Sequence, residues 1–181
     1  MSGHRTAGVT QRDVPSLYDS FALYGSGVTL VSVRDDAGDR FFIAASVLTA
    51  SVDPFTIALS VGGNRDALPV ITGGATWAVS VLGTQHLPLV RALTTRTSPA
   101  ERLDALAATG AESSPEGPLW LPDALVTLWA RAHTVLPVHD QFLLVGEVTR
   151  GSVHQHSTPL LRWNRDFRTT TAVPATRASV A

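Results

Sequence analysis

Hydrophobic and polar residues alternate with a period of two along much of the chain, which is the pattern that predicts β-strands. The first such stretch, "VTLVSV" at 28–33, is followed by the turn cluster "DDAGD" and by "RFFIA" at 40–44. These segments together predict a hairpin. The same criteria predict further strands over 55–61, 75–82, 124–138, 140–153 and 159–167.

Helical periodicity replaces this alternation in the remaining patterned segments. An N-terminal segment places Leu17, Phe21 and Tyr24 on one helical face, at spacings of four and three. The clearest helix start lies in mid-chain, where Ser98 and Glu101 match a capping box with proline at the first helical position. Helices are predicted over 14–25, 65–74, 84–93 and 98–110, with a loop over 111–123.

Six or seven strands with helices inserted in mid-chain indicate a mainly β protein, a β-barrel with helical insertions. A doubly wound sheet is not indicated, because helices do not alternate regularly with strands. The chain has 181 residues and no internal repeat or dividing linker, so one domain is expected over 14–168. Residues 1–13 and 169–181 are predicted to be flexible tails.

Composition and charge narrow the class of function. The net charge is -1 with 14 basic residues, so no basic surface predicts binding to nucleic acid or to an anionic membrane. Cysteine is absent, which excludes disulfides, thiolate catalysis and cysteine–zinc sites. No signal peptide or membrane-spanning run is evident, and we expect a cytoplasmic protein. Only 16% of the residues are charged, which favours an oligomer with an apolar interface.

Motifs for phosphate, hydrolytic or metal chemistry are not evident. The chain lacks the P-loop pattern and the nucleophile elbow, and "GSG" at 25–27 precedes a strand rather than a helix. His154 and His156 would share a face of a strand, but no third ligand is evident, so we predict structural or surface roles and no metal site. The adjacent His139 and Asp140 are best interpreted as solvent-facing turn residues.

One stretch breaks the strand pattern with small and hydroxylated residues, from Ala44 to Ser51, and is closed by "VDP". Free backbone N–H groups at a strand end, next to small side chains, allow a planar ligand to approach closely. Downstream, "GGNRD" places a glycine turn beside Arg65, whose guanidinium suits a phosphate. From the residues alone, a tight turn with a surface arginine is the simpler interpretation.

Five segments in this order resemble the flavin reductase-like family, which has the FMN-binding split-barrel fold. They are "GVTLVSVRDDAG", "AASVLTASVDPFTIALSVG", "ATWAVSVL", "DQFLLVGEV" and "PLLRW", and the resemblance covers roughly Phe21 to Phe167. Ala44 to Pro54 resembles the family's flavin-carrying segment. The resemblance therefore implies a split β-barrel with short helical insertions.

The resemblance also implies a set of cofactor-binding residues. The ring of FMN or FAD would lie against the backbone and small side chains of the segment, and the flavin phosphate would lie at the loop after the next strand. The residues implied to line the ring are Ala45, Ser46, Val47 and Leu48, with Thr49 and Ser51 near it, and those implied for the phosphate are Gly63, Asn64 and Arg65.

The implied activity is hydride transfer from NADH or NADPH to the flavin, with release of reduced flavin to a partner monooxygenase. No acid or base side chain is required, because the redox chemistry belongs to the cofactors, so no catalytic residue is assigned. Members of the family are mostly homodimers. The sequence distinguishes neither FMN from FAD nor NADH from NADPH.

Three departures from the family pattern leave an alternative open. The resemblance places His139, Asp140 and Gln141 on the nicotinamide side. Where the family often has Gly-Asp-His, however, this chain has His139-Asp140-Gln141, so the histidine associated with the nicotinamide is replaced by Gln141. Asp66 stands where a hydroxyl is usual in the phosphate stretch, and "NRD" replaces a glycine between aromatics near the C-terminus. The alternative is a non-catalytic protein that binds a flavin or another flat ligand on the same scaffold.

Overall fold

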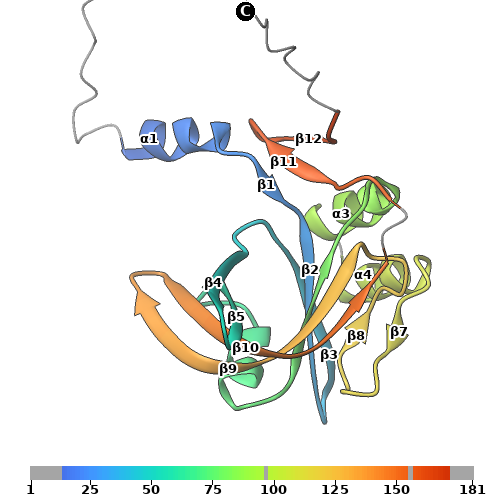
Figure 1. The fold of residues 1–181 in the computed structure, drawn as a ribbon. Coiled ribbons are helices and arrows are strands. Elements are labelled where there is room, and N and C mark those ends of the chain that lie inside the picture. Colours follow the sequence, from blue (N-terminus) through green and yellow to red (C-terminus); the bar gives the residue numbers. More distant parts are fainter. Residues whose placement is uncertain (1–13, 96–97, 155–156, 172–181) are drawn as a thin grey trace, which may run out of the picture.

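The computed structural model describes residues 14–95, 98–154 and 157–171, and strands dominate it (Figure 1). The tail predicted over 1–13 and residues 172–181 of the C-terminal tail lie outside the described residues. The main sheet contains seven strands, all paired antiparallel with their neighbours. In spatial order they are β3 (Gly38–Ala44), β2 (Thr29–Asp35), β6 (Trp77–Val81), β9 (Val126–Val138), β10 (Gln141–Val153), β5 (Phe55–Gly62) and β4 (Leu48–Val52).

The two edge strands of this sheet, β3 and β4, follow each other directly in the chain. Only residues 45–47 separate Ala44 from Leu48, and four peptide links span at most about 14 Å. The sheet must therefore curl until its two edges approach each other at this end, while they remain unpaired. Figure 1 shows the resulting open barrel, with β4 and β5 on one side of the split and β2 and β3 on the other.

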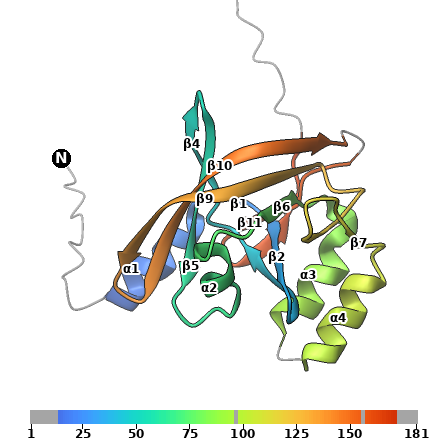
Figure 2. The ribbon, with the colours of Figure 1, turned by 90° about the horizontal axis from the view of Figure 1, so that it is seen from below.

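Period-two alternation divides the buried side chains between two clusters. Val31, Val33 and Phe42 belong to the cluster inside the curled sheet, together with the fully buried Trp77. Their neighbours Leu30 and Phe41 point to the other face and belong to a second cluster. There they pack with the apolar sides of α3 (Leu87–Thr94) and α4 (Pro99–Ala107), which lie side by side, away from α1, in Figure 2.

The predicted helices are confirmed. The N-terminal helix α1 (Val14–Ser20) continues as the short 3-10 segment η2 (Phe21–Leu23), and α2 (Ala67–Thr72) and η3 (Thr84–His86) complete the set. The capping box also forms: the Glu101 amide donates to Ser98 Oγ at 3.3 Å, and the Ser98 amide donates to Glu101 Oε2 at 2.7 Å.

The fold differs from the predicted elements in three segments. Residues 48–52, expected as a loose ligand edge, form strand β4, because β5 supplies a partner for their backbone groups. The predicted loop over 111–123 contains the short pair β7 (Glu112–Ser113) and β8 (Leu119–Trp120). The predicted last strand is instead a hairpin, β11 (Leu161–Trp163) and β12 (Asp166–Arg168), and β11 also pairs with β1 (Ser26–Gly27).

Candidate functional site

A cavity of about 830 Å³ opens beside the split in the barrel, a volume typical of sites for small molecules and cofactors. Segments from three distant parts of the chain line it. They are residues of the N-terminal segment 18–27, the linker 45–47 with the adjoining Leu48 of β4, and Arg162 and Arg165 from the C-terminal hairpin. The cavity therefore includes the first four of the residues that the resemblance implied for the flavin ring.

The linker between β3 and β4 has free backbone groups. Within the described part of the chain, the structure records no backbone hydrogen bond from the amides of residues 45–47. The Ser46 hydroxyl, by contrast, is engaged: it donates to the Ser60 carbonyl at 3.0 Å and accepts the Ser60 amide at 3.2 Å. The linker thus offers main-chain donors to a ligand while its serine fixes the linker to β5.

Thr49 and Ser51 lie beyond the cavity. Both belong to β4, where Thr49 pairs with Ile57 and Ser51 pairs with Thr56 across an irregularity in register. Neither residue lines the cavity. Of the six residues predicted at or near the ring, four line the cavity, and Thr49 and Ser51 do not.

Gly63, Asn64 and Arg65 form the loop after β5, and none of them lines the cavity. The Gly63 amide donates to the Asp140 carbonyl at 2.9 Å, and the Arg65 guanidinium lies 5.6 Å from the centroid of the Phe42 ring. A Cβ added at Gly63 would lie 3.2 Å from Phe142, so glycine suits this close approach. The predicted phosphate loop is thereby held against the turn between β9 and β10.

That turn carries the three residues predicted for the nicotinamide side. His139 has a φ of 53°, in the left-handed region, and Gln141 Nε2 donates to Asp140 Oδ2 at 3.0 Å. The loop at 63–65 and the turn at 139–141 thus come together, two predicted groups that lie far apart in the sequence. Ser60, bonded to Ser46, lies on β5 just before this loop and connects the loop with the cavity.

The opposite wall of the cavity consists of residues that were not predicted from the sequence. Tyr18, Phe21 and Tyr24 line it from the N-terminal segment, and Arg162 and Arg165 line it from the hairpin. The available signal was the aromatic character of the N-terminal helix, which we interpreted only as an apolar packing face. Phe21 is in fact 66% exposed and Tyr24 68% exposed.

A second polar cluster lies at the start of the helical insertion, around the buried His86. The Gly83 amide donates to His86 Nδ1 at 3.1 Å, so the ring proton lies on Nε2, which donates to Asp123 Oδ1 at 2.9 Å. Burial raises the pKa of Asp123, but the hydrogen bond from His86 outweighs it, and the pKa is lowered overall.

No catalytic constellation is formed by this cluster. A neighbouring cavity of about 560 Å³ is lined by Thr84, Gln85, Asp123, His154 and Ser157. The Ser157 hydroxyl donates to Gln85 rather than to an imidazole. Among the residues that the structure describes, no three His, Asp or Glu side chains gather in a way that would hold a metal ion, and His156 lies outside them.

The curled antiparallel sheet, whose two edge strands remain unpaired (Figure 1), defines a protein of the split-barrel class. The model of the flavin reductase like domain matches residues 21–171, and the chain belongs to this family. No helix among the described residues is long and apolar enough to cross a membrane.

The proteins similar to this chain include two that are named as a reductase component or an oxidoreductase and one that is named as a polyketide dimerase. The reductase component of 4-hydroxyphenylacetate 3-monooxygenase from Thermus thermophilus is 26% identical over 83% of this chain and 92% of its own. The actinorhodin polyketide dimerase of Streptomyces coelicolor is 26% identical over 86% of this chain and 85% of its own. The solved NADH:FAD oxidoreductase SgcE6 of Streptomyces globisporus has a TM-score of 0.80 and 23% identity, covering 93% of this chain and 99% of its own.

Proposed function

We propose that this protein is an NAD(P)H-dependent flavin reductase that supplies reduced flavin to a partner monooxygenase. The observation that carries the proposal is the linker 45–47 in a chain of the flavin reductase family: its residues line a cavity of cofactor size, and no backbone hydrogen bond from their amides is recorded in the part of the chain that the structure describes. The relative from Thermus thermophilus supports the partnership, since it is the reductase component of a monooxygenase.

The residues present fit a flavin nucleotide. The linker amides would donate to the polar edge of the isoalloxazine ring, and the small side chain of Ala45 allows the ring to approach the backbone. Gly63, Asn64 and Arg65 would receive the phosphate, with the Arg65 guanidinium as its cationic partner. The flavin, when bound, supplies the hydride chemistry, and the chain holds and orients the reactants.

The turn at 139–141 is proposed to position the nicotinamide. It adjoins the phosphate loop through the bond from the Gly63 amide to the Asp140 carbonyl. The Gln141 amide is held by Asp140, so His139, at its left-handed position, supplies the imidazole of this turn. Variants of His139 and Gln141 should raise the KM for the nicotinamide nucleotide without changing the Kd for the flavin.

The test is an anaerobic titration of the purified protein with FMN or FAD present, followed by NADH and then NADPH. We expect catalytic bleaching of the visible flavin band. Flavin binding without bleaching by either nucleotide would contradict the reductase and favour the second candidate, a flavin-binding protein without turnover. The replacement of a histidine by Gln141 and the presence of Asp66 beside the phosphate loop are the observations that favour this second candidate.

We also propose a homodimeric, cytoplasmic protein with one domain over 14–168. Large apolar side chains are exposed on β4 and at the end of the β9–β10 hairpin, as expected of surfaces that pack against another chain. Val52 is 83% exposed, Leu136 52% and Val138 45%. A second copy of this chain is the partner that the low charged fraction of the sequence favours.

A further inference from the structure

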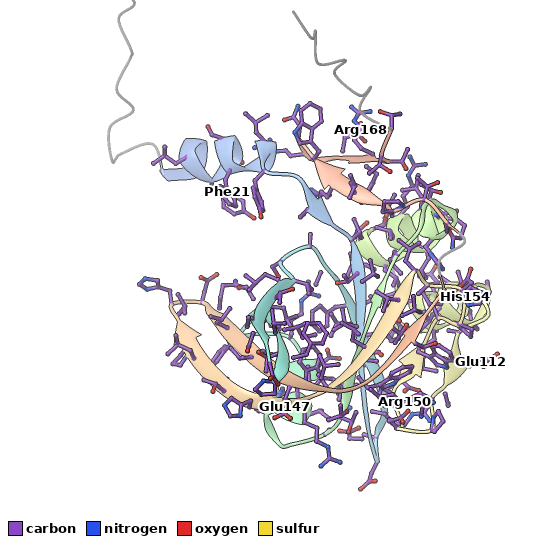
Figure 3. The ribbon with its side chains drawn as sticks, in the orientation of Figure 1. Phe21, Glu112, Glu147, Arg150, His154 and Arg168 are labelled. Carbon is purple, nitrogen blue, oxygen red and sulfur yellow. The ribbon has the colours of Figure 1, made fainter. Side chains whose placement is uncertain are left out.

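The wall of the cavity that faces Ala45 to Leu48 carries a stacked aromatic pair. The rings of Phe21 and Tyr24 have centroids 5.3 Å apart and planes 19° from parallel, and about two-thirds of each side chain is exposed. Figure 3 shows Phe21 projecting from the N-terminal helical segment toward the main sheet. Exposed ring faces at the rim of a cavity are surfaces on which a planar base stacks.

Two guanidinium groups line the same cavity. Arg162 lies on β11, with its guanidinium 5.6 Å from the centroid of the Phe167 ring, and no ion pair with it is recorded among the described residues. Arg165 lies in the following turn and forms an ion pair with Asp19. Asp19 also lines the cavity, so these three side chains together leave one net positive charge there. A guanidinium has five donors in a planar fork that matches phosphate oxygens, and one carboxylate does not use all of them.

The β11–β12 hairpin fixes the place of Arg165. Trp163 pairs with Asp166, so Asn164 and Arg165 form a two-residue turn between them. Their φ values of 49° and 64° are those that such a tight hairpin turn requires. The turn is also fixed in place, because the Asn164 amide donates to the Ala22 carbonyl at 2.7 Å. The aromatic pair and the two guanidiniums are therefore held together as one wall.

Strand pairing places this wall beside the proposed flavin segment. Gly27 pairs with Leu161 on β11, while Thr29, just after it, pairs with Ala44 at the end of β3. The chain at 26–29 therefore lies between the hairpin and the linker, with the cavity shared by both. A ligand that binds the linker extends toward the aromatic pair and the guanidiniums within the same cavity.

We propose that Phe21, Tyr24, Arg162 and Arg165 bind the adenosine-phosphate arm of a dinucleotide. The ring faces take the adenine, and the guanidiniums take the phosphates. The assignment rests on the proposed function, in which the linker holds the isoalloxazine ring of the flavin. FAD and the nicotinamide dinucleotide both carry this arm, and it is absent from FMN and riboflavin.

The direct test uses ADP-ribose, which contains the arm but neither a flavin nor a nicotinamide. Calorimetry should show that the wild-type protein binds it, that Arg162→Gln weakens binding about tenfold or more, and that Tyr24→Leu also weakens it. Arg165→Gly removes the charge while suiting the backbone, and should weaken binding too. Arg168→Gln is the matched control on the same hairpin, since Arg168 pairs with Asp166 and lies outside the cavity.

Two further measurements identify the source of the arm. If the arm that binds here belongs to the flavin, Arg162→Gln weakens the binding of FAD about tenfold and leaves the binding of FMN and riboflavin unchanged. If it belongs to the reductant, the same variant raises the KM for NADH with FMN as acceptor and leaves the KM for reduced nicotinamide mononucleotide unchanged. Either result supports the assignment.

The proposal is overturned if wild-type protein fails to bind millimolar ADP-ribose, or if Arg162→Gln binds it as tightly as wild type. It is also overturned if Arg168→Gln loses the same affinity for ADP-ribose. The third contrary result is that Arg162→Gln weakens the binding of FAD and of riboflavin equally and leaves the KM for NADH unchanged. ADP-ribose binding by a protein that neither binds flavin nor oxidises NADH would leave the subsite standing and contradict the proposed function alone.

Discussion

The hydroxyl of Ser46 takes the place of a backbone group opposite Ser60. Leu48 pairs with Ala58, and continuing that register would put the Ser46 backbone opposite Ser60. Instead Ser46 Oγ donates to the Ser60 carbonyl at 3.0 Å and accepts the Ser60 amide at 3.2 Å. The side chain thus completes the ladder of β5, and the backbone of the linker stays available at the cavity.

Replacing Ser46 with tryptophan should block the cavity. We expect Ser46→Trp to weaken FMN binding by more than about tenfold while the thermal unfolding transition is retained, because the site lies at an exposed linker. Fluorescence titration with FMN measures the effect. Thr49→Trp is the matched control, since Thr49 lies on the next strand outside the cavity, and it should bind FMN normally. An unchanged titration for Ser46→Trp would remove the linker from the flavin site.

Arg65 should distinguish flavins that carry a phosphate from those that do not. Arg65→Ala is expected to weaken the binding of FMN about tenfold and to leave the binding of riboflavin nearly unchanged. The reason is that only FMN has a phosphate, so only its complex loses a charge-assisted hydrogen bond. The two dissociation constants, measured side by side, check this. Equal weakening of both flavins would mean that Arg65 supports the loop through its contact with Phe42 rather than binding phosphate.

Gly146 should tolerate no side chain. It lies at a shift of register in β10, and a Cβ there would overlap the indole of Trp77, which is fully buried. Gly146→Val is expected to lower the free energy of unfolding by about 1–3 kcal/mol through overpacking, as measured by denaturant unfolding. Gly27→Ala is the control, because nothing lies within 4 Å of its added Cβ. Equal stability of the two variants would contradict this account of the core.

The free energy of unfolding should decrease in acid, and protonation of Asp123 should account for part of the decrease. The pKa of this carboxyl is lower in the folded protein than its ordinary value of 3.8, since the hydrogen bond from His86 outweighs burial. A lowered folded-state pKa contributes stability above the unfolded pKa, and that contribution is lost as the pH falls below about 4 through the folded pKa. Asp123→Asn should therefore show a smaller loss of stability in this range than wild type. Asp36→Asn, in the exposed turn after β2, is the control, and a wild-type-like profile for Asp123→Asn would contradict the assignment.

The proposed homodimer should depend on the exposed apolar end of the β9–β10 hairpin. Leu136→Asp is expected to shift the protein from dimer to monomer in sedimentation experiments, because a charge would be buried at the interface. Leu103→Asp is the control, since Leu103 is 46% exposed on α4, which Figure 1 shows on the far side of the sheet from the hairpin end. A monomeric wild-type protein, or a dimer unaffected by Leu136→Asp, would contradict this interface.

The sequence by itself determined the elements whose signals are local. Alternation at 28–33 predicted β2 because successive side chains of a strand point to opposite faces, and in β2 both faces are buried. The capping box at Ser98 and Glu101 predicted the start of α4 from four consecutive residues. The ordered segments also identified the family, and with it the split-barrel fold.

Only the tertiary structure decided which residues meet at the cavity. Thr49 and Ser51 look like ligand contacts in the sequence, but β5 offers their backbone a ladder, so they became part of β4. Phe21 and Arg162 lie far apart in the chain and meet because β1 pairs with β11. The pairing partner of a strand and the closure of a curled sheet are long-range choices, set by the burial of the whole core, and no local pattern of residues encodes them.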